Sequence, residues 1–486
     1  MDARFEDDGE TVLVLSGTGS ASDAPASVEV IGPRARAVGT VAASDDGWRA
    51  VVPLSASRWG GPVLPLPSGE YVVRATRGDG ARVEVDASAP LTMLGTLRAS
   101  LDGAALRIGP PIDPAYDSGE GQDALERRYA TRPGGLENAV FFESFYGRNA
   151  SCNPLAIDRE LARVAPGVTR YWSVVDLSVQ TPEGAVPVVE GGPEWWRARG
   201  ASRLLVVNDW LRRRFVRRPG QVVLQTWHGT ALKRLALHRP GFDPRRMAAV
   251  VKESRRWDVL LAQNPYGERI LRKAYAFLRR PVWVEGYPRN DVLRTDDGVA
   301  TRAALGIGAD ERVVLYAPTW RDDREQMVDF LDPVALAEQA DAVVLVRGHS
   351  RTLLPGSDAA GPRVIDVTAY PDISRLLVVA DALVTDYSSV MFDFSATGKP
   401  MYFLAPDLEH YRGELRGFYF DLPARAPGPF VQTQDELAEA LADPGTAERY
   451  AERYAAWQAR FNARDDGHAA ERVVARILDQ GFVARE

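Results

Sequence analysis

The first 110 residues alternate short runs of apolar and polar positions, separated by Gly, Pro, Ser and Asp. The run at residues 70–75 is an example. A period of two is typical of strands with one buried face. The spacing predicts a small all-β, sandwich-like domain over residues 1–110. Because this part has no histidine and only scattered acidic residues, we expect an accessory role for it.

From residue 138 onward, fully apolar runs alternate with amphipathic segments of helix length. The runs lie at residues 139–142, 204–207, 222–224, 259–262 and 282–284, and in a second block at 313–316, 343–346, 363–366, 382–385 and 401–404. This alternation predicts an α/β fold with parallel sheets covered by helices. We therefore expect a linker at 111–137 and two Rossmann-like domains at 138–300 and 301–486.

The bulk composition suits a globular protein of 486 residues, of which 45% are hydrophobic. The sequence has no apolar run of about 18 residues and its N-terminus is acidic, so we expect neither a transmembrane helix nor a signal peptide. The single cysteine, Cys152, cannot form an internal disulfide, which favours a cytoplasmic location.

The charge is unevenly distributed. The chain carries −7 in total, whereas residues 203–280 contain 19 Lys and Arg against 5 Asp and Glu, a local charge of +14. Such a segment needs an anionic partner, which can be nucleic acid, anionic lipid or a polyanionic substrate. The alternative is a set of solvated helix faces balanced by acidic neighbours in the fold.

One of the five histidines, His228, follows the apolar run that ends near residue 225, in the segment 226–230 (TWHGT). Ligands of open α/β sheets bind beyond the carboxyl ends of the strands. An imidazole at such a position is a natural general base for a hydroxyl group. Gly229 allows close approach of the backbone, and Lys233 follows about one helical turn later.

Three loops of the second block carry groups suited to phosphate. Arg347 and His349 follow one strand, Thr319 and Arg321 follow another, and Thr385, Ser388 and Ser389 lie between a strand and a helix. Amide groups at a helix N-terminus favour anions. Each loop alone is also compatible with an ordinary cap or a satisfied histidine.

Two features argue against other chemistries. Lys399 lies in a Thr-Gly-Lys-Pro segment without the spacing of a P-loop, so it either supplies a cation or caps a helix. The acidic pair Asp322 and Asp323 has no third ligand at a suitable spacing, so we expect a solvated turn and no metal site.

Taken together, these segments resemble the CDP-glycerol:poly(glycerophosphate) glycerophosphotransferases, which polymerise teichoic acids and related capsular polyol phosphates. The matching stretches, in the order of that family, are residues 140–147 with 153–154, 207–209, 225–230, 286–291, 316–321, 347–349, 370–373, 385–389 with 392–393, and 416–421. One departure is Ala231, where the family usually has proline. Residues 1–110 lie outside the resemblance.

The resemblance implies a GT-B fold, in which the second Rossmann-like domain binds the nucleotide-linked donor and the final helix crosses back to the first. It also implies a lipid-linked polyol-phosphate acceptor and peripheral action at the inner face of the membrane. The segments 195–196 (two tryptophans) and 211–218 are candidates for contact with an anionic membrane surface.

The resulting hypothesis is transfer of a polyol phosphate from CDP-glycerol or CDP-ribitol without a metal or other cofactor. His228 is the expected base. Arg347 and His349 hold the diphosphate with Ser388 and Ser389. The remaining candidates are, for phosphate, Thr385, Thr319, Arg321, Lys399 and Lys233, and, for the nucleotide, Tyr370, Pro371 and Asp372. We expect no nucleic-acid partner, and a homo-oligomer is compatible with the sequence. The alternatives are a sugar transferase of the same fold and a non-catalytic polyanion- or lipid-binding relative.

Overall fold

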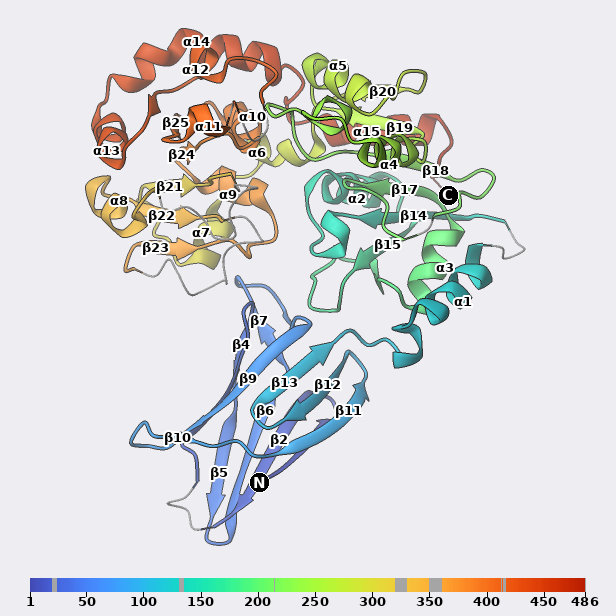
Figure 1. Cartoon of the computed structure of the whole chain (residues 1–486), viewed down its shortest axis with the longest axis vertical. Coiled ribbons are helices and arrows are strands. Elements are labelled where there is room, and N and C mark those ends of the chain that lie inside the picture. The colour runs from blue at the N-terminus through green and yellow to red at the C-terminus, as the bar shows by residue number, and fades with distance from the viewer. Residues whose placement is uncertain are drawn as a thin grey trace. The chain divides into compact units, whose positions relative to one another are not determined.

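The computed structural model (Figure 1) describes residues 1–19, 24–130, 135–213, 215–319, 330–348, 361–411, 413 and 417–485. The chain forms two compact units. The first comprises Met1–Leu136, Phe145–Ala150 and Arg170–Ala201, and the second comprises Glu137–Ser144, Ser151–Thr169 and Ser202–Glu486.

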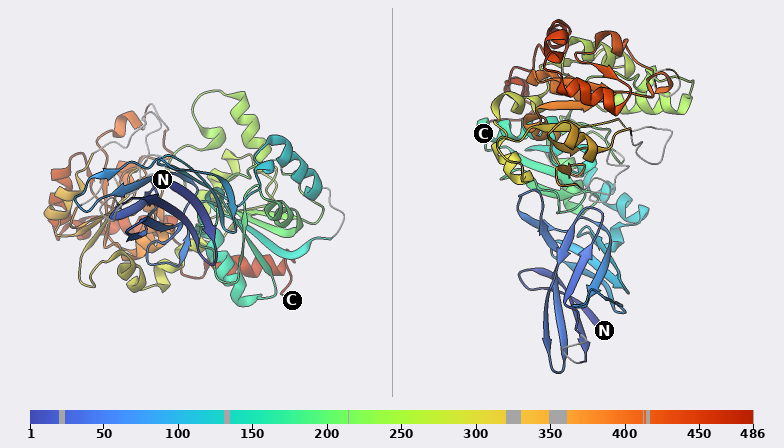
Figure 2. Two further views of the ribbon diagram at one scale, coloured as in Figure 1. Left: turned by 90° about the horizontal axis from the view of Figure 1, so that it is seen from below. Right: turned by 90° about the vertical axis from the view of Figure 1, so that its left-hand side faces the viewer.

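The first unit begins with an antiparallel β region, which Figure 2 shows from two further directions. One sheet has the order β1-β2-β6-β5 and the other the order β11-β12-β13-β9-β3-β4, with β10 beside β9 and a separate β7-β8 hairpin. The strands are β1 (Asp2–Asp7), β2 (Thr11–Thr18), β3 (Ser27–Ile31), β4 (Arg36–Val38), β5 (Thr40–Ser44), β6 (Gly47–Pro53), β7 (Ser55–Ser57), β8 (Val63–Pro65), β9 (Gly69–Thr76), β10 (Arg82–Val83), β11 (Ser88–Leu94), β12 (Leu97–Asp102) and β13 (Ala105–Gly109).

Apolar side chains from both sheets form one core. Leu13 and Trp48 of the first sheet and Val28, Val73 and Leu106 of the second belong to the same buried cluster. Two antiparallel sheets that share a core make a sandwich. The predicted N-terminal antiparallel β region is thus confirmed.

The rest of the first unit contains η2 (Pro114–Tyr116), α1 (Gly119–Ala130), η3 (Phe145–Gly147), the parallel strands β15 (Thr169–Val174) and β16 (Val186–Val189), and α3 (Pro193–Ala201). Asp176 joins this part to the β region, because its Oδ2 accepts a hydrogen bond of 2.8 Å from the Ser68 amide. Arg58 adds a bond of 2.5 Å from its Nη2 to the Ser178 carbonyl.

The two tryptophans of α3 correct one prediction. Trp195 and Trp196 are only 1% and 6% exposed. Each indole Nε1 donates to a polar group inside the first unit, at 2.8 Å to Ser173 Oγ and 2.9 Å to Gln122 Oε1. Arg199 also lies over both rings. These side chains are part of the core and are not available to a lipid surface.

The second unit contains two parallel sheets. In the first, β14 (Glu137–Glu143), β17 (Ser202–Val207), β18 (Val222–Gln225), β19 (Val259–Ala262) and β20 (Val282–Val284) lie side by side in that order. Its helical segments are α2 (Cys152–Val164), η4 (Ala236–His238), α4 (Pro244–Ser254), α5 (Pro265–Ala274), η5 (Pro288–Asn290) and α6 (Val292–Thr295). Strands covered on both faces read as continuous apolar runs, which explains the sequence pattern.

The second sheet has the order β23-β22-β21-β24-β25-β26 and is also parallel. Its strands are β21 (Val313–Tyr316), β22 (Val343–Val346), β23 (Val364–Asp366), β24 (Ala382–Thr385), β25 (Met401–Leu404) and β26 (Phe430–Val431). The helical segments around it are α7 (Val299–Leu305), α8 (Pro333–Gln339), α9 (Ile373–Val379), α10 (Val390–Phe394), η6 (Ser395–Thr397), α11 (Leu408–His410), α12 (Leu422–Arg425) and α13 (Gln434–Ala442).

The last two helices connect the sheets. The long helix α14 (Thr446–Phe461) packs on η6, where Trp457 Nε1 donates to Ser395 Oγ at 3.2 Å. The chain then turns and α15 (Ala469–Asp479) packs against α2; it is the red helix among the green elements in Figure 1. Asp291 caps α15 by accepting from the amides of Ala469 and Ala470 at 2.9 and 2.7 Å.

Candidate active site

Loops from the two parallel sheets of the second unit meet beside His228. Gly229 follows β18, and Ser389 follows β24 and precedes α10. A Cβ atom added to Gly229 would lie 2.9 Å from Ser389 Oγ, so a larger residue at this position would require Ser389 to shift. The structure thus brings the His228 loop next to one of the predicted phosphate-binding residues, Ser389, which Ser388 precedes in the chain.

The tautomer of His228 follows from its hydrogen bond. Its Nδ1 lies 2.6 Å from the carbonyl oxygen of Asn208, and the ring stacks on Trp227 with a centroid separation of 4.9 Å and an interplanar angle of 17°. A carbonyl oxygen only accepts, so Nδ1 must carry the proton. In the neutral imidazole this leaves Nε2 with the lone pair of a base.

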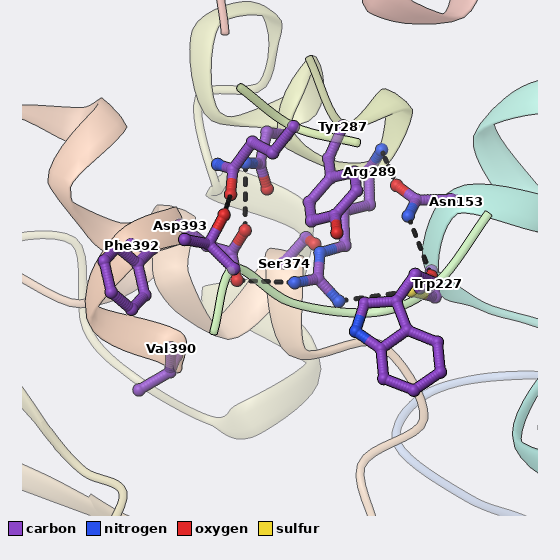
Figure 3. Close-up of polar contacts among 12 residues, drawn as sticks. Asn153, Trp227, Tyr287, Arg289, Ser374, Val390, Phe392 and Asp393 are labelled. Carbon is purple, nitrogen blue, oxygen red and sulfur yellow. Dashed lines mark hydrogen bonds and ion pairs between the residues drawn. The ribbon is translucent and has the colours of Figure 1, made fainter. Parts of the chain in front are cut away.

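The His228 loop is held by buried polar side chains. Trp227 has a left-handed backbone with φ of 53°. Asn153 Nδ2 donates to the carbonyls of Thr226 and Trp227 at 3.3 and 3.2 Å, as Figure 3 shows for Trp227. Gln225 Oε1 accepts from the Trp227 amide at 2.9 Å. These bonds hold a backbone conformation that an aromatic residue rarely adopts.

An ion pair next to this loop joins the two sheets (Figure 3). Arg289 Nη2 of η5 lies 2.6 Å from Asp393 Oδ2 of α10, and Asn290 Nδ2 donates to the other carboxylate oxygen at 3.0 Å. Arg289 and Asp393 are 7% and 5% exposed. Burial raises the pKa of Asp393, and the positive charge of Arg289 opposes that rise. Arg289 Nη1 also donates to Cys152 Sγ at 3.2 Å.

Arg289 also acts on the His228 loop through its backbone. Its amide donates to Asn153 Oδ1 at 3.2 Å, and Asn153 in turn binds the carbonyl of Trp227. Arg289, Asp393 and Asn153 lay within stretches that carried the family resemblance, but sequence reasoning assigned no role to any of them. These three residues could have been found from the sequence, because they lie in short family motifs whose other residues had no assigned role.

A second buried chain reaches the loop from the other side. Thr230 Oγ1 donates to Gln263 Oε1 at 2.5 Å, and Gln263 Nε2 donates to Asp465 Oδ2 at 2.7 Å. Asp465 lies in the turn between α14 and α15 and also accepts from Asn462 Nδ2 at 2.9 Å. Burial raises the pKa of Asp465 to about 6. The segment that connects the two sheets is thus hydrogen-bonded to the His228 loop.

The loops after β21 and β24 support each other. The Thr385 hydroxyl donates to the Ala317 carbonyl at 2.7 Å, and the Thr319 amide donates to Asp386 Oδ1 at 2.9 Å. The hydroxyl of Thr385 is therefore engaged within the fold. The amide of Val390 is 3.5 Å from Ser388 Oγ, and α10 is only five residues long. Its N-terminus therefore presents little more than one turn of amides to an anion.

Arg347 and the predicted nucleotide residues lie together. Arg347 Nη1 donates to the carbonyls of Val367 and Tyr370 at 3.1 and 2.9 Å. Burial lowers the pKa of Arg347 to about 10, against the opposing effect of Asp372. Asp372 begins α9 by accepting from the Ser374 amide at 3.1 Å, and burial raises its pKa. Pro371 is exposed. Part of the Arg347 guanidinium thus serves to position this loop.

The two candidate lysines differ in their surroundings. Lys399 Nζ donates to the carbonyls of Val378 and Ala380 at 2.8 Å each. It therefore caps the end of α9, which was the alternative to a phosphate ligand. Lys233 pairs with Phe418 in an isolated antiparallel bridge and its Nζ lies 5.8 Å from the Tyr411 ring centroid. It lies where the two halves of the second unit meet.

Two predicted residues, His349 and Arg321, lie outside the described residues, as do Asp322 and Asp323. Within the described ranges, no group of three or more His, Cys, Asp or Glu side chains is arranged to hold a metal ion. In the same ranges no helix is long and apolar enough to cross a bilayer.

These features agree with comparisons to known proteins. A family model described as CDP-Glycerol:Poly(glycerophosphate) glycerophosphotransferase matches residues 128–479. The chain belongs to this family of enzymes, as its motifs predicted.

Curated relatives cover the same part of the chain. A teichoic acid glycerol-phosphate transferase of Staphylococcus aureus is 36% identical over 70% of this chain and 93% of its own length. A teichoic acid poly(glycerol phosphate) polymerase of Bacillus subtilis is 36% identical over 70% of this chain, which spans only 48% of that relative.

A solved structure of the wall teichoic acid polymerase TagF, a histidine-to-asparagine variant soaked with CDPG, has a TM-score of 0.69. The match is 31% identical and covers 74% of this chain and 93% of that one. The mixed α/β architecture of the second unit is therefore that of the family.

Proposed function

We propose that the chain transfers glycerol phosphate from CDP-glycerol to the terminal hydroxyl of a lipid-anchored polyol-phosphate chain and releases CMP. The observation that carries this proposal is His228. Its Nδ1–H is fixed on the Asn208 carbonyl, so Nε2 is the base, at the carboxyl end of β18 and beside the Ser389 loop. In a member of this family, such a base has a hydroxyl acceptor to deprotonate.

The proposed reaction is one displacement at phosphorus. The acceptor oxygen bonds to the phosphorus that carries the polyol, and the bond from that phosphorus to the bridging oxygen breaks. The hydroxyl proton moves to His228 Nε2, and CMP takes the electron pair of the broken bond. His228 then returns the proton to solvent or product. Positioning of the reactants and electrostatic stabilisation of the transition state carry most of the rate enhancement in phosphoryl transfer, and the base contributes about 10²- to 10⁴-fold.

The donor is proposed to bind the second sheet of a GT-B fold. Ser388 and Ser389 are proposed to bind the diphosphate, which is supported by the closeness of Ser389 to Gly229 at the junction of the two sheets. Arg347, His349, Thr319, Arg321 and Lys233 are the further phosphate candidates, and Tyr370, Pro371 and Asp372 the nucleotide candidates. Thr385 and Lys399 are the weakest candidates, since their polar groups bind backbone carbonyls.

We propose that no resident metal ion takes part and that cationic side chains and loop amides offset the phosphate charge. Glycerol is favoured over ribitol because both relatives with 36% identity are named for glycerol phosphate.

The test is a donor panel. The full chain is incubated with a lipid-linked acceptor and with CDP-glycerol, CDP-ribitol or a UDP-sugar, and the products are read by mass spectrometry. The proposal requires a mass increase of one glycerol phosphate per step. Transfer of a sugar alone would refute it, and transfer of ribitol phosphate alone would change the assigned donor.

Contact with an anionic membrane is also proposed, at a different place from the buried tryptophans of α3. Phe242 is 84% exposed in the turn before α4, and Arg245 beside it is exposed as well. An exposed aromatic ring next to a cation is typical of side chains that enter a lipid interface.

A further inference from the structure

Five cationic side chains follow one another across the junction of the two parallel sheets. We call them the cationic stripe: Arg234, Lys273, Arg269, Arg460 and Arg425. Lys273 and Arg269 are one turn apart on α5, which places them on one face of that helix. Arg460 of α14 lies beside the same helix, because its guanidinium is 5.2 Å from the ring centroid of Tyr266, a residue of α5.

Electrostatic effects on Arg460 and on His238 indicate which charges lie near each of these two side chains. Burial, then the charges of Arg425 and Arg269, lower the pKa of Arg460. Burial, then the charges of Arg234 and Lys273, lower the pKa of His238. The stripe therefore runs from α12 and α14 on the second-sheet side, over α5, to the segment after the His228 loop.

The side chains of the stripe have no ion-pair partner in the described part of the chain. Among the residues that the structure describes, none of its five side chains forms an ion pair or a hydrogen bond. By contrast, Arg272 on the same helix pairs with Glu268 at 2.9 Å. Like charges held together without a carboxylate repel one another, and a bound anion relieves that repulsion.

Arg460, near the centre of the stripe, is held among aromatic rings. The Arg460 guanidinium lies 5.2 Å from the ring centroids of Tyr266 and Phe461 and 5.8 Å from that of Phe420. The Tyr266 hydroxyl donates to the Ala231 carbonyl at 2.9 Å, three residues beyond His228. Arg460 thus packs on Tyr266, which is hydrogen-bonded to the segment that follows the proposed base.

We propose that the cationic stripe binds successive phosphodiester groups of the acceptor chain and leads its free end toward His228. This inference rests on the proposed function, because it takes the acceptor to be a polyol phosphate. A flexible polyanion fits better than a membrane surface, since the rings of Tyr266 and Phe461 under the stripe are buried and offer lipid no apolar contact.

The test compares two variants that each lose two positive charges. Arg269→Gln/Arg460→Gln removes the centre of the stripe. Arg74→Gln/Arg82→Gln removes two exposed arginines of the β region and is the matched control. A labelled, soluble poly(glycerol phosphate) oligomer is titrated with the full chain without donor, from about 50 to about 200 mM salt. Sedimentation with phosphatidylglycerol vesicles and the thermal shift caused by CDP are measured in parallel.

We expect the stripe variant to bind the oligomer about five- to thirty-fold more weakly and with a smaller salt dependence. The control should stay within about twofold, and CDP should shift the melting temperature of both variants equally. Unchanged oligomer affinity in the stripe variant would overturn the inference. So would loss of vesicle binding alone, which would assign the stripe to a membrane. If the unsubstituted chain binds the oligomer through the stripe but transfers nothing from any CDP donor, the proposed function fails and the polyanion site stands.

Discussion

The buried pair of Arg289 and Asp393 allows the sharpest test of how the second unit is held together. Replacing Arg289 by Met leaves a carboxylate that is 5% exposed with one remaining donor, Asn290 Nδ2 at 3.0 Å. Removal of one partner from a buried ion pair costs about 3–5 kcal/mol, because the other charge stays desolvated. The Arg289 amide, which binds Asn153, is retained in this variant.

Two further variants separate the loss of stability caused by the unpaired charge from the effect of replacing a large side chain. Arg289→Met/Asp393→Leu removes both charges, so we expect it to lose less stability than Arg289→Met alone. Arg363→Met is the matched control, because its pair with Asp341 is exposed to solvent and contributes little to stability. The measurement is urea unfolding followed by tryptophan fluorescence and far-UV circular dichroism.

Two outcomes would refute this reasoning. One is a loss of about 1 kcal/mol or less for Arg289→Met, comparable to the exposed control. Asp393→Leu alone completes the cycle. The other refuting outcome is a double variant whose loss equals the sum of the losses of Arg289→Met and Asp393→Leu, because additivity would mean that the charges do not depend on each other.

Four further results are expected. His228→Ala should lower turnover by about 10² to 10⁴ while CDP still raises the melting temperature; near-normal polymerisation would remove His228 as the base. EDTA should leave the transfer rate unchanged, and a rate restored only by Mg²⁺ would contradict the metal-free proposal. Folding raises the pKa of Asp465 to about 6, so protonation of this carboxyl stabilises the folded state fully below about pH 4. The free energy of unfolding should therefore fall by roughly 3 kcal/mol at most as the pH rises through 6. Asp465→Asn should lack this part of the pH dependence of unfolding. Phe242→Ser should weaken sedimentation with phosphatidylglycerol vesicles by about tenfold or more, whereas Val299→Ser, at a residue that is 64% exposed, should not.

The hydrophobic pattern was sufficient to predict the strands of the two parallel sheets and to locate the loops with candidate site residues. Strands buried on both faces read as apolar runs, and ligand groups lie beyond their carboxyl ends, so β18, β21, β22 and β24 and their loops were found without a structure. The prediction for His228 followed from the same rule. The tautomer did not, because the Asn208 group that fixes it is a backbone carbonyl, which no residue type reveals.

The hydrophobic pattern could not predict which large or charged side chains are exposed. Trp195 and Trp196 lie near arginines in sequence and were assigned to a membrane surface, whereas helix α3 buries both. Adjacent residues on a helix point about 100° apart, so burial of both requires contacts on two sides, which depend on segments distant in sequence. Lys399 likewise had two interpretations until its partners at the end of α9 were known.

A gain in stability is a poor explanation for the ion pair between Arg289 and Asp393. A buried ion pair recovers little more than its own desolvation cost, and apolar residues of similar volume often do as well. The geometry gives a different reason, because Arg289 links α10 of the second sheet to Asn153, which holds the carbonyl of Trp227. An apolar pair would fill the space without fixing the direction of these bonds. The charge pair is therefore best understood as setting the position of the His228 loop relative to the Ser389 loop, where an error of about 1 Å can cost about a hundredfold in rate.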